Sequence, residues 1–388
     1  MYHLQLISSS SSSSLTTQNP PMKLPFPPPN PTTTTITNRL HFLSTIPRRR
    51  RRHHHHRPSM DHATAITPVT PSKRQSHRKD KLVVILGATG CGKSRLSLDL
   101  AARFPCEIIN ADKMQVYRGL DITTNKLPLP DRLSVSHHLL GQYDSSLGDL
   151  TPTQYRLHAD AAITEIISRK KIPLLVGGSN SLVYALLAAH FSPHHDVFGT
   201  SNSPFCSDLR YKCCFLWINV SGPVLDRYLE IRVDEMLGSG MLEELERYYD
   251  SGEVDESEPG TGLRNAIGVP EFEKYFRSFS SGDGDDGSSR KREGLYSEAV
   301  REIKENTRRL ARRQVEKILR LERGGWDLQR LDATEAVRAA MRENGGRGPP
   351  LPAEGTQSEI WERGVVEPSV KTVKQFLEDD EVDVVEEE

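Results

Sequence analysis

The sequence predicts an α/β fold in which helices flank a parallel sheet, and two observations carry this prediction. Short apolar runs alternate along the chain with longer segments whose apolar residues recur every three or four positions. This alternation is typical of strand–helix–strand units, in which the strands are parallel and buried. The second observation is a glycine-rich turn at 87–94, which separates the first predicted strand from the first predicted helix.

The first strand, 82–86, is entirely apolar, as expected of a strand that is buried on both faces. The turn after it fits the pattern G-x-x-x-x-G-K-S, and helical periodicity follows over 95–104. Strand, glycine-rich loop and helix in this order form a phosphate-binding P-loop. The candidate phosphate-binding residues are Gly87, Ala88, Thr89, Gly90, Cys91, Gly92, Lys93 and Ser94. The fold class is therefore P-loop nucleoside-triphosphate-hydrolase-like.

The chemistry of a P-loop explains these residue types. Its glycines let backbone N–H groups converge on one point, and the helix N-terminus adds positive potential. Lys93 can then reach a terminal phosphate, and Ser94 can ligate Mg²⁺. A glycine turn that binds nothing is the alternative, but all fixed positions and both flanking elements match the motif.

The remaining elements continue the alternation. Apolar runs predict strands at 106–111, 171–178 and 212–219. Apolar stripes at helical spacing predict helices at 152–170, 180–189, 223–249 and 296–321. The last of these helices is dense in Arg and Lys on its other face, and it should close the folded region as a small helical C-terminal part.

Composition divides the chain into three parts. Residues 1–79 are predicted to be a disordered leader, because 1–60 contain no Asp or Glu and are rich in Ser, Thr and Pro, as in organelle transit peptides. Residues 80–325 are predicted to form the domain, with a flexible insertion at 278–292. Residues 326–388 are Gly/Pro-rich and then acidic, which predicts a mostly disordered tail.

Charge and composition also constrain location and partners. The leader favours the plastid, with the mitochondrion or the cytoplasm as alternatives, because prolines between Pro20 and Pro31 would break an amphipathic mitochondrial helix. Residues 81–388 carry more acidic than basic side chains, which argues against a nucleic-acid partner. The chain lacks an apolar run long enough to span a membrane, and its five cysteines lack metal-site spacing. We expect a monomer in a reducing compartment.

Asp112 is the leading catalytic candidate, because it ends the second predicted strand. In open α/β sheets the ligand crevice lies at the carboxyl ends of the strands. A carboxylate there could hold Mg²⁺ on a nucleotide or act as a general base. It could also cap the following segment without any catalytic role.

Six blocks of the chain resemble the dimethylallyl (isopentenyl) transferases in the right order. They lie at 87–94, 110–126, 137–141, 176–180, 262–271 and 306–314, and together they span about residues 80–325. The resemblance implies that the P-loop binds dimethylallyl diphosphate with Lys93 and Mg²⁺, and that N6 of adenine is the acceptor. It implies that Asp112 removes the N6 proton while Thr89 positions the Asp112 carboxylate. It places these candidate substrate contacts in the blocks: Gln115, Thr124, Lys126, Ser179, Asn180, Arg264 and Arg308. For Arg312 we favour a solvated or salt-bridged helix face.

This family has one branch that prenylates tRNA and another that prenylates free adenine nucleotides. The block at 177–181 reads G-G-S-N-S, and 138–141 reads H-L-L-G, both of which resemble the adenylate branch. Only 191–212 separate a predicted helix from a predicted strand where the tRNA branch inserts a helical domain. The chain also has no Cys beyond Cys214 for a C-terminal zinc finger. The resemblance thus implies an adenylate dimethylallyltransferase of cytokinin biosynthesis. A tRNA dimethylallyltransferase, a P-loop small-molecule kinase and a regulatory nucleotide-binding protein are the alternatives.

Overall fold

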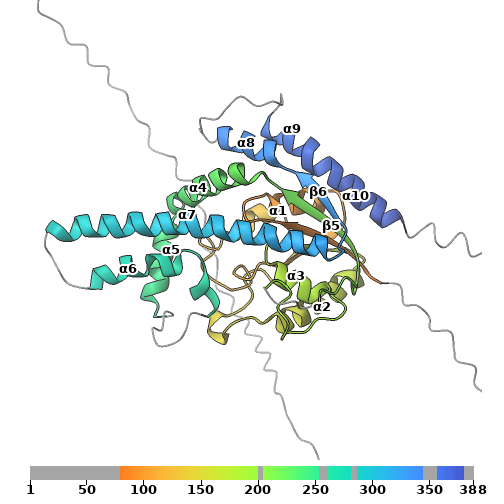
Figure 1. The fold of residues 1–388 in the computed structure, drawn as a ribbon, viewed down its shortest axis with the longest axis horizontal. Coiled ribbons are helices and arrows are strands. Elements are labelled where there is room, and N and C mark those ends of the chain that lie inside the picture. The colour runs from red at the N-terminus through yellow and green to blue at the C-terminus, as the bar shows by residue number, and fades with distance from the viewer. Residues whose placement is uncertain (1–78, 200–203, 253–260, 281–285, 344–355, 380–388) are drawn as a thin grey trace, which may run out of the picture. The chain divides into compact units, whose positions relative to one another are not determined.

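The computed structural model describes residues 79–199, 204–252, 261–280, 286–343 and 356–379. Apart from Lys79, the predicted leader lies outside these ranges. Within them, six parallel strands form one sheet, and helices pack on both of its faces (Figure 1). The predicted α/β class is therefore confirmed. None of the described helices is long and apolar enough to cross a membrane.

The sheet has the strand order β3-β2-β4-β1-β5-β6. The strands are β1 (Lys81–Gly87), β2 (Cys106–Asn110), β3 (His137–His138), β4 (Ile172–Val176), β5 (Lys212–Asn219) and β6 (Leu328–Asp332). β1 is central and pairs with β4 on one side and β5 on the other, with Val83 opposite both Leu174 and Cys214. The carboxyl ends of β1, β2 and β4 consequently lie side by side, which sets the position of the site.

The described helices alternate with these strands or follow them. The main helices are α1 (Lys93–Ala101), α2 (Pro152–Ser168), α3 (Asn180–Leu187), α4 (Gly222–Gly238), α5 (Met241–Asp250), α6 (Val269–Ser280), α7 (Asp286–Arg323), α8 (Thr334–Glu343), α9 (Gln357–Trp361) and α10 (Glu367–Glu378). The short turns are the 3₁₀ helices η1 (Leu129–Arg132), η2 (Ser145–Leu147) and η3 (Gly262–Asn265), and the π-helical turn η4 (Glu362–Val366).

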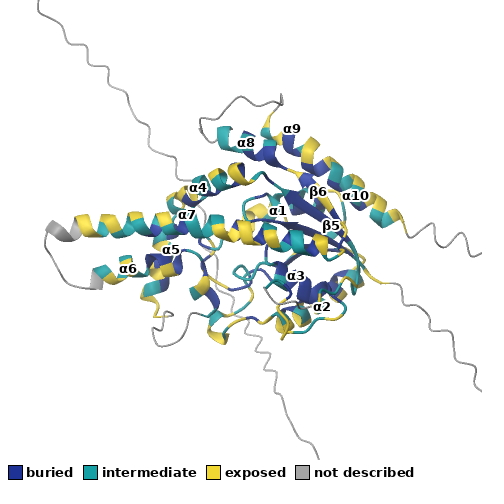
Figure 2. Ribbon diagram, viewed as in Figure 1, coloured by how far each residue is buried: buried dark blue, intermediate teal, exposed yellow. Residues whose placement is uncertain are grey.

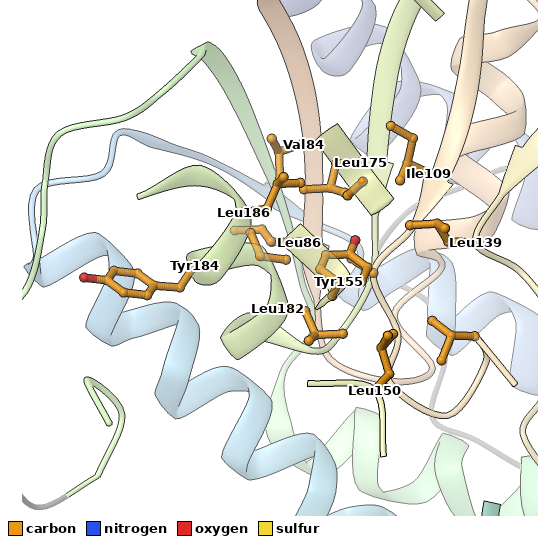
Figure 3. Packing of buried hydrophobic residues seen from close by; sticks show 14 of the residues in the cluster. Val84, Leu86, Ile109, Leu139, Leu150, Tyr155, Leu175, Leu182, Tyr184 and Leu186 are labelled. Carbon is orange, nitrogen blue, oxygen red and sulfur yellow. The ribbon is translucent and has the colours of Figure 1, made fainter. Parts of the chain in front are cut away.

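Two apolar cores hold the layers together, because successive strand residues point to opposite faces. Val84 and Leu86 of β1 pack toward α2 and α3, where Tyr155 and Leu186 are also buried (Figure 3). Val83 of β1 packs toward the opposite core, which α1, α4, α8 and α10 cover. Burying each such side chain contributes about 1.5–3 kcal/mol.

Two predicted helical segments have different bounds in the structure. The predicted helix 223–249 is two helices, α4 and α5, because Gly240 adopts a φ of 100° between them. The predicted insertion 278–292 is helical at both ends, since α6 runs to Ser280 and α7 begins at Asp286. Residues 281–285 lie outside the described ranges. Figure 2 shows α7 buried along one side and exposed along the other.

The prediction of a disordered tail at 326–388 is wrong for most of that segment. It supplies the edge strand β6 and the helices α8, α9 and α10, and their buried residues join the core on the α1 side of the sheet. In β6 only Leu328 and Leu331 are buried, so no apolar run signals the strand. The Gly/Pro-rich stretch 344–355 and the acidic end 380–388 lie outside the described residues.

A buried carboxylate beneath β3 gives a prediction about stability. Glu107 is 3% exposed, and its carboxylate accepts hydrogen bonds from His138 Nε2 at 2.7 Å and Arg169 NH2 at 2.6 Å, with Lys171 Nζ at 3.0 Å. Burial by itself would raise the pKa of Glu107, but the hydrogen bonds from these three side chains lower it to about 2 from 4.5. The ionised form therefore stabilises the fold above pH 4.5, and this stabilisation is lost as the pH falls from 4.5 toward 2.

We expect Glu107→Gln to lower the free energy of unfolding by about 2 kcal/mol at pH 7, because a buried neutral amide replaces a carboxylate that accepts hydrogen bonds from the partly exposed Arg169 and Lys171. Chemical denaturation at pH 7 and pH 3 measures the effect, which should shrink at the lower pH. The matched control is Glu165→Gln, which removes an exposed partner of Arg169 and should cost less than about 0.5 kcal/mol. Equal losses in the two variants would contradict the assignment.

Candidate functional site

A cavity of about 820 Å³ lies at the carboxyl ends of β1, β2 and β4. Its wall includes the loop after β1, the segment after β2 and one side of α4. A site is expected at this edge of the sheet, since parallel strands there bring together loops that are distant in sequence. Most of the residues predicted from the P-loop and from Asp112 line this one cavity, as described below.

The P-loop has the backbone that its glycines predict. Gly90 and Gly92 have φ values of 82° and 99°, which non-glycine residues rarely adopt. Lys93 folds its ammonium group back onto the loop, and Nζ donates to Ala88 O at 2.8 Å. The backbone N–H of Thr89 donates to Gln314 Oε1 of α7 at 2.7 Å. The loop is therefore held by a side chain of α7 that lies 225 positions away in the sequence.

The loop residues do not all reach the cavity. Thr89, Gly90, Gly92, Lys93 and Ser94 line it. Gly87, Ala88 and Cys91 are buried behind them, where they shape the turn. Burial also raises the pKa of the Cys91 thiol, so this cysteine stays protonated at neutral pH.

Asp112 lines the cavity directly after β2. Its Oδ1 accepts hydrogen bonds from the backbone N–H of Met114 at 3.0 Å and of Gln115 at 3.4 Å, so it does cap the following turn. Within the described part of the chain, no hydrogen bond is formed by Oδ2. One carboxylate oxygen therefore positions the group, while the other remains available to a ligand.

Arg232 of α4 is a site residue that the sequence analysis missed. It lines the cavity, and its NH1 donates to Thr89 Oγ1 at 3.0 Å. Burial lowers the pKa of its guanidinium, which nevertheless remains charged at neutral pH. In the sequence, Arg232 lies at helical spacing from Leu229 and Met236, at the edge of the apolar stripe of its helix, but its contact with the loop depends on how α4 packs.

The cavity is lined by both cationic and apolar side chains. Among the described residues, its basic side chains are Lys93, Arg95, Lys126, Arg132 and Arg232, and its acidic side chains are Asp112, Asp121 and Glu235. Its apolar side chains include Ile108, Ile122, Leu127, Leu140, Val176 and Met236. Such a cavity suits a ligand that joins a polyanionic group to a small apolar group.

Three of the predicted substrate contacts lie in the segment after β2. Gln115 and Lys126 line the cavity. Gln115 Nε2 donates to Thr124 O at 3.1 Å, and Lys126 Nζ donates to Thr124 Oγ1 at 2.9 Å. Burial lowers the pKa of Lys126, whose ammonium also pairs with Asp121 at 2.9 Å. Thr124 itself does not line the cavity, but it accepts hydrogen bonds from the other two side chains.

Four other predicted contacts do not line the cavity. Ser179 Oγ accepts from Lys113 N at 2.9 Å, and Asn180 Nδ2 donates to the backbone carbonyl of α7 at 3.1 Å, so both hold the fold together. Arg264 lies in η3, away from the cavity wall. Arg308 forms ion pairs with Glu230 and Glu305. In this structure Ser179, Asn180 and Arg308 bond to other residues of the fold, and that these four residues contact substrate stays a prediction.

Arg312 lies on a solvated, salt-bridged helix face, as we expected from the sequence. Its NH2 pairs with Asp226 Oδ2 of α4 at 2.6 Å, and its side chain is 58% exposed. The basic face of α7 is thus partly neutralised by acidic residues of α4, and this salt-bridged helix face is confirmed.

The donor groups at the loop suit Mg²⁺ bound together with a phosphate group. No cluster of three His, Cys, Asp or Glu side chains capable of holding a metal occurs in the described ranges. Mg²⁺ on a diphosphate, however, takes most of its ligands from water and phosphate oxygens. Ser94 is exposed at the start of α1 and Asp112 lines the same cavity, so a hydroxyl and a carboxylate are present to complete such a shell.

Comparison with known proteins gives consistent relatives. The family model described as IPP transferase matches residues 115–201 and 190–318. An adenylate isopentenyltransferase of Humulus lupulus is 55% identical over 76% of this chain and 90% of its own length. The chloroplastic adenylate isopentenyltransferase 1 of Arabidopsis thaliana is 50% identical over 78% of this chain and 83% of its own. Other Arabidopsis relatives are also named chloroplastic, and one at 40% identity is named mitochondrial.

Solved structures share the fold at lower identity. A eukaryotic dimethylallyltransferase acting on tRNA matches with a TM-score of 0.55 and 24% identity, over 73% of this chain and 83% of its own. A tRNA isopentenylpyrophosphate transferase of Bacillus halodurans matches with a TM-score of 0.55 and 23% identity, over 78% of this chain and 100% of its own. At these identities the likeness concerns the fold alone.

Proposed function

This chain belongs to the IPP transferase family, and we propose that it transfers the dimethylallyl group of dimethylallyl diphosphate to N6 of adenine in ATP, ADP or AMP, the first step of cytokinin biosynthesis. One observation supports the proposal most. The P-loop and Asp112 line the same cavity, and the cavity combines basic and apolar side chains. A diphosphate ester with a short hydrocarbon tail matches that combination.

The P-loop side of the cavity would bind the leaving diphosphate. Loop N–H groups and the ammonium of Lys93 would take up the negative charge that develops as the C–O bond breaks. Arg232 donates a hydrogen bond to Thr89 Oγ1, so both side chains would lie at the same end of the prenyl diphosphate. Mg²⁺, held by Ser94 and the diphosphate itself, would supply further charge neutralisation when bound.

Asp112 would act on the acceptor. The N6 amine of adenine is a poor nucleophile, because its lone pair is delocalised into the ring. A carboxylate that removes its proton as the new C–N bond forms would contribute about 10²–10⁴ in rate. Asp112 is suited to this role, because the turn N–H groups fix Oδ1 while Oδ2 faces no other described partner.

The nucleotide acceptor is favoured over tRNA by the relatives rather than by the fold. Proteins that are 40–55% identical to this chain are named adenylate isopentenyltransferases, whereas the tRNA enzymes resemble it only in fold. In addition, the described residues between α3 and β5 contain no helix, so they hold no helical domain at that point. A kinase reaction is disfavoured, because the family model and the similar proteins are named as isopentenyl-group transferases.

The proposal is tested by product analysis with competing acceptors. Purified protein is incubated with dimethylallyl diphosphate, MgCl₂ and AMP, ADP, ATP or unmodified tRNA in parallel, and products are identified by mass spectrometry. Prenylated nucleotide without prenylated tRNA is the expected result. Prenylated tRNA alone, or a phosphorylated product accompanied by ADP, would contradict it.

We also propose that residues 1–80 direct the protein to plastids, in keeping with the chloroplastic names of several relatives. A fusion of residues 1–80 to a fluorescent protein should colocalise with chlorophyll in leaf cells, whereas a fusion of 81–388 should not. Mitochondrial labelling would support the alternative suggested by one relative's name. A diffuse signal would mean that the segment is not a targeting sequence.

A further inference from the structure

Trp361, from the segment predicted to be disordered, packs against the P-loop. A Cβ added to Gly92 would lie only 2.6 Å from Trp361 Cη2, so the indole fills the space that a side chain there would need. The indole Nε1 donates to Asp99 Oδ2 at 2.8 Å, and the Arg95 guanidinium lies 4.8 Å from the ring centroid. Positions 92, 95 and 99 share one face of α1, so the ring contacts the helix along two turns.

The segment that carries Trp361 is anchored at two points that follow this residue in the chain. Glu362 pairs with Arg103, at the end of α1, at 2.6 Å. Farther along, Lys81 Nζ of β1 donates to Phe376 O at 2.9 Å and to Leu377 O at 2.8 Å. Trp361 itself is only 4% exposed. Figure 1 shows α9 and α10 on the side of the sheet that α1 covers, and their buried residues belong to the core on that side.

We propose that Trp361 is a positioning residue for the donor diphosphate, an inference that rests on the proposed function of the P-loop. Gly92 and Arg95 line the cavity, whereas Trp361 does not. The ring therefore acts through α1: it fixes the backbone at the start of the helix and orients the Arg95 side chain. A phosphate cradle depends on N–H groups aimed at one point, and a misplacement of about 1 Å can cost a hundredfold in activity.

The test compares two buried tryptophans in the full-length protein. Inorganic pyrophosphate with MgCl₂ is titrated calorimetrically into the wild type, Trp361→Leu and Trp326→Leu. Trp326 is the matched control, since it is 2% exposed and packs with Tyr184 and Phe215 in the core on the other face of the sheet. We expect pyrophosphate affinity to fall about tenfold in Trp361→Leu and to stay unchanged in Trp326→Leu.

A milder variant keeps the test decisive if Trp361→Leu does not fold. Trp361→Phe retains an aromatic ring but loses the N–H donor to Asp99, and it should weaken pyrophosphate by about threefold and raise the donor KM while the ATP KM is unchanged. Wild-type affinity in folded Trp361 variants, or an equal loss in Trp326→Leu, would overturn the inference. A wild type that fails to bind pyrophosphate would instead overturn the proposed role of the P-loop.

Discussion

Replacing Asp112 by Asn should lower kcat by about 10²–10⁴-fold, because an amide cannot accept the N6 proton. The fold should survive, since Asn Oδ1 can still accept hydrogen bonds from the N–H groups of Met114 and Gln115. Pyrophosphate affinity should also survive, because the P-loop, Lys93 and Arg232 are unchanged. Steady-state kinetics with dimethylallyl diphosphate and ADP, combined with thermal denaturation and pyrophosphate titration, measure all three quantities.

The control for this variant is Asp131→Asn, an exposed carboxylate on η1 that does not line the cavity, which should behave like the wild type. The same titrations separate the two roles considered for Asp112. If the carboxylate mainly held Mg²⁺, Asp112→Asn would weaken Mg²⁺-dependent pyrophosphate binding. A variant that binds pyrophosphate normally and turns over at the wild-type rate would rule out the general base.

Replacing Lys93 by Ala should raise the KM for dimethylallyl diphosphate about a hundredfold and leave ATP affinity nearly unchanged. The loss of a buried charged partner costs about 3 kcal/mol, which corresponds to about two powers of ten in affinity. The loop itself should persist, because the hydrogen bond that is lost, from Nζ to Ala88 O, is replaced by water in the open cavity.

Lys113→Ala is the matched control, since Lys113 pairs with Asp149 and does not line the cavity. Separate titrations with a non-reactive donor analogue and with ATP distinguish the two ligands. If ATP affinity collapsed in Lys93→Ala while donor affinity stayed intact, the P-loop would bind the nucleotide instead, and the kinase reaction would be favoured.

The parts of the site that could be predicted from the sequence are those encoded in short contiguous stretches. The P-loop is one such stretch, in which strand, glycine turn and helix follow directly. Asp112 is another, because a carboxylate at the end of a buried parallel strand faces the crevice whatever packs around it. For both, the local pattern and the general rule for parallel sheets were sufficient.

The parts that could not be predicted depend on packing between distant elements. Arg232 and Thr89 are 143 residues apart, and their contact depends on how α4 crosses the loop. Arg308 occupies a family block, but its partner on α4, Glu230, cannot be identified from that block. Trp361 is one aromatic residue in a polar segment, and its burial becomes evident only when α9 and η4 pack with α1 in the core on that face of the sheet.

The central claim is that the P-loop presents a prenyl diphosphate, rather than a nucleoside triphosphate, for reaction. Reaction of [1-¹³C]dimethylallyl diphosphate with ATP carrying ¹⁵N at the exocyclic amine, followed by NMR and phosphate analysis, tests it most directly. We expect a one-bond ¹³C–¹⁵N coupling in the NMR spectrum of the product. We also expect one pyrophosphate to be released for each C–N bond formed, with the ATP phosphates intact. Formation of ADP without any ¹³C–¹⁵N bond would contradict the claim.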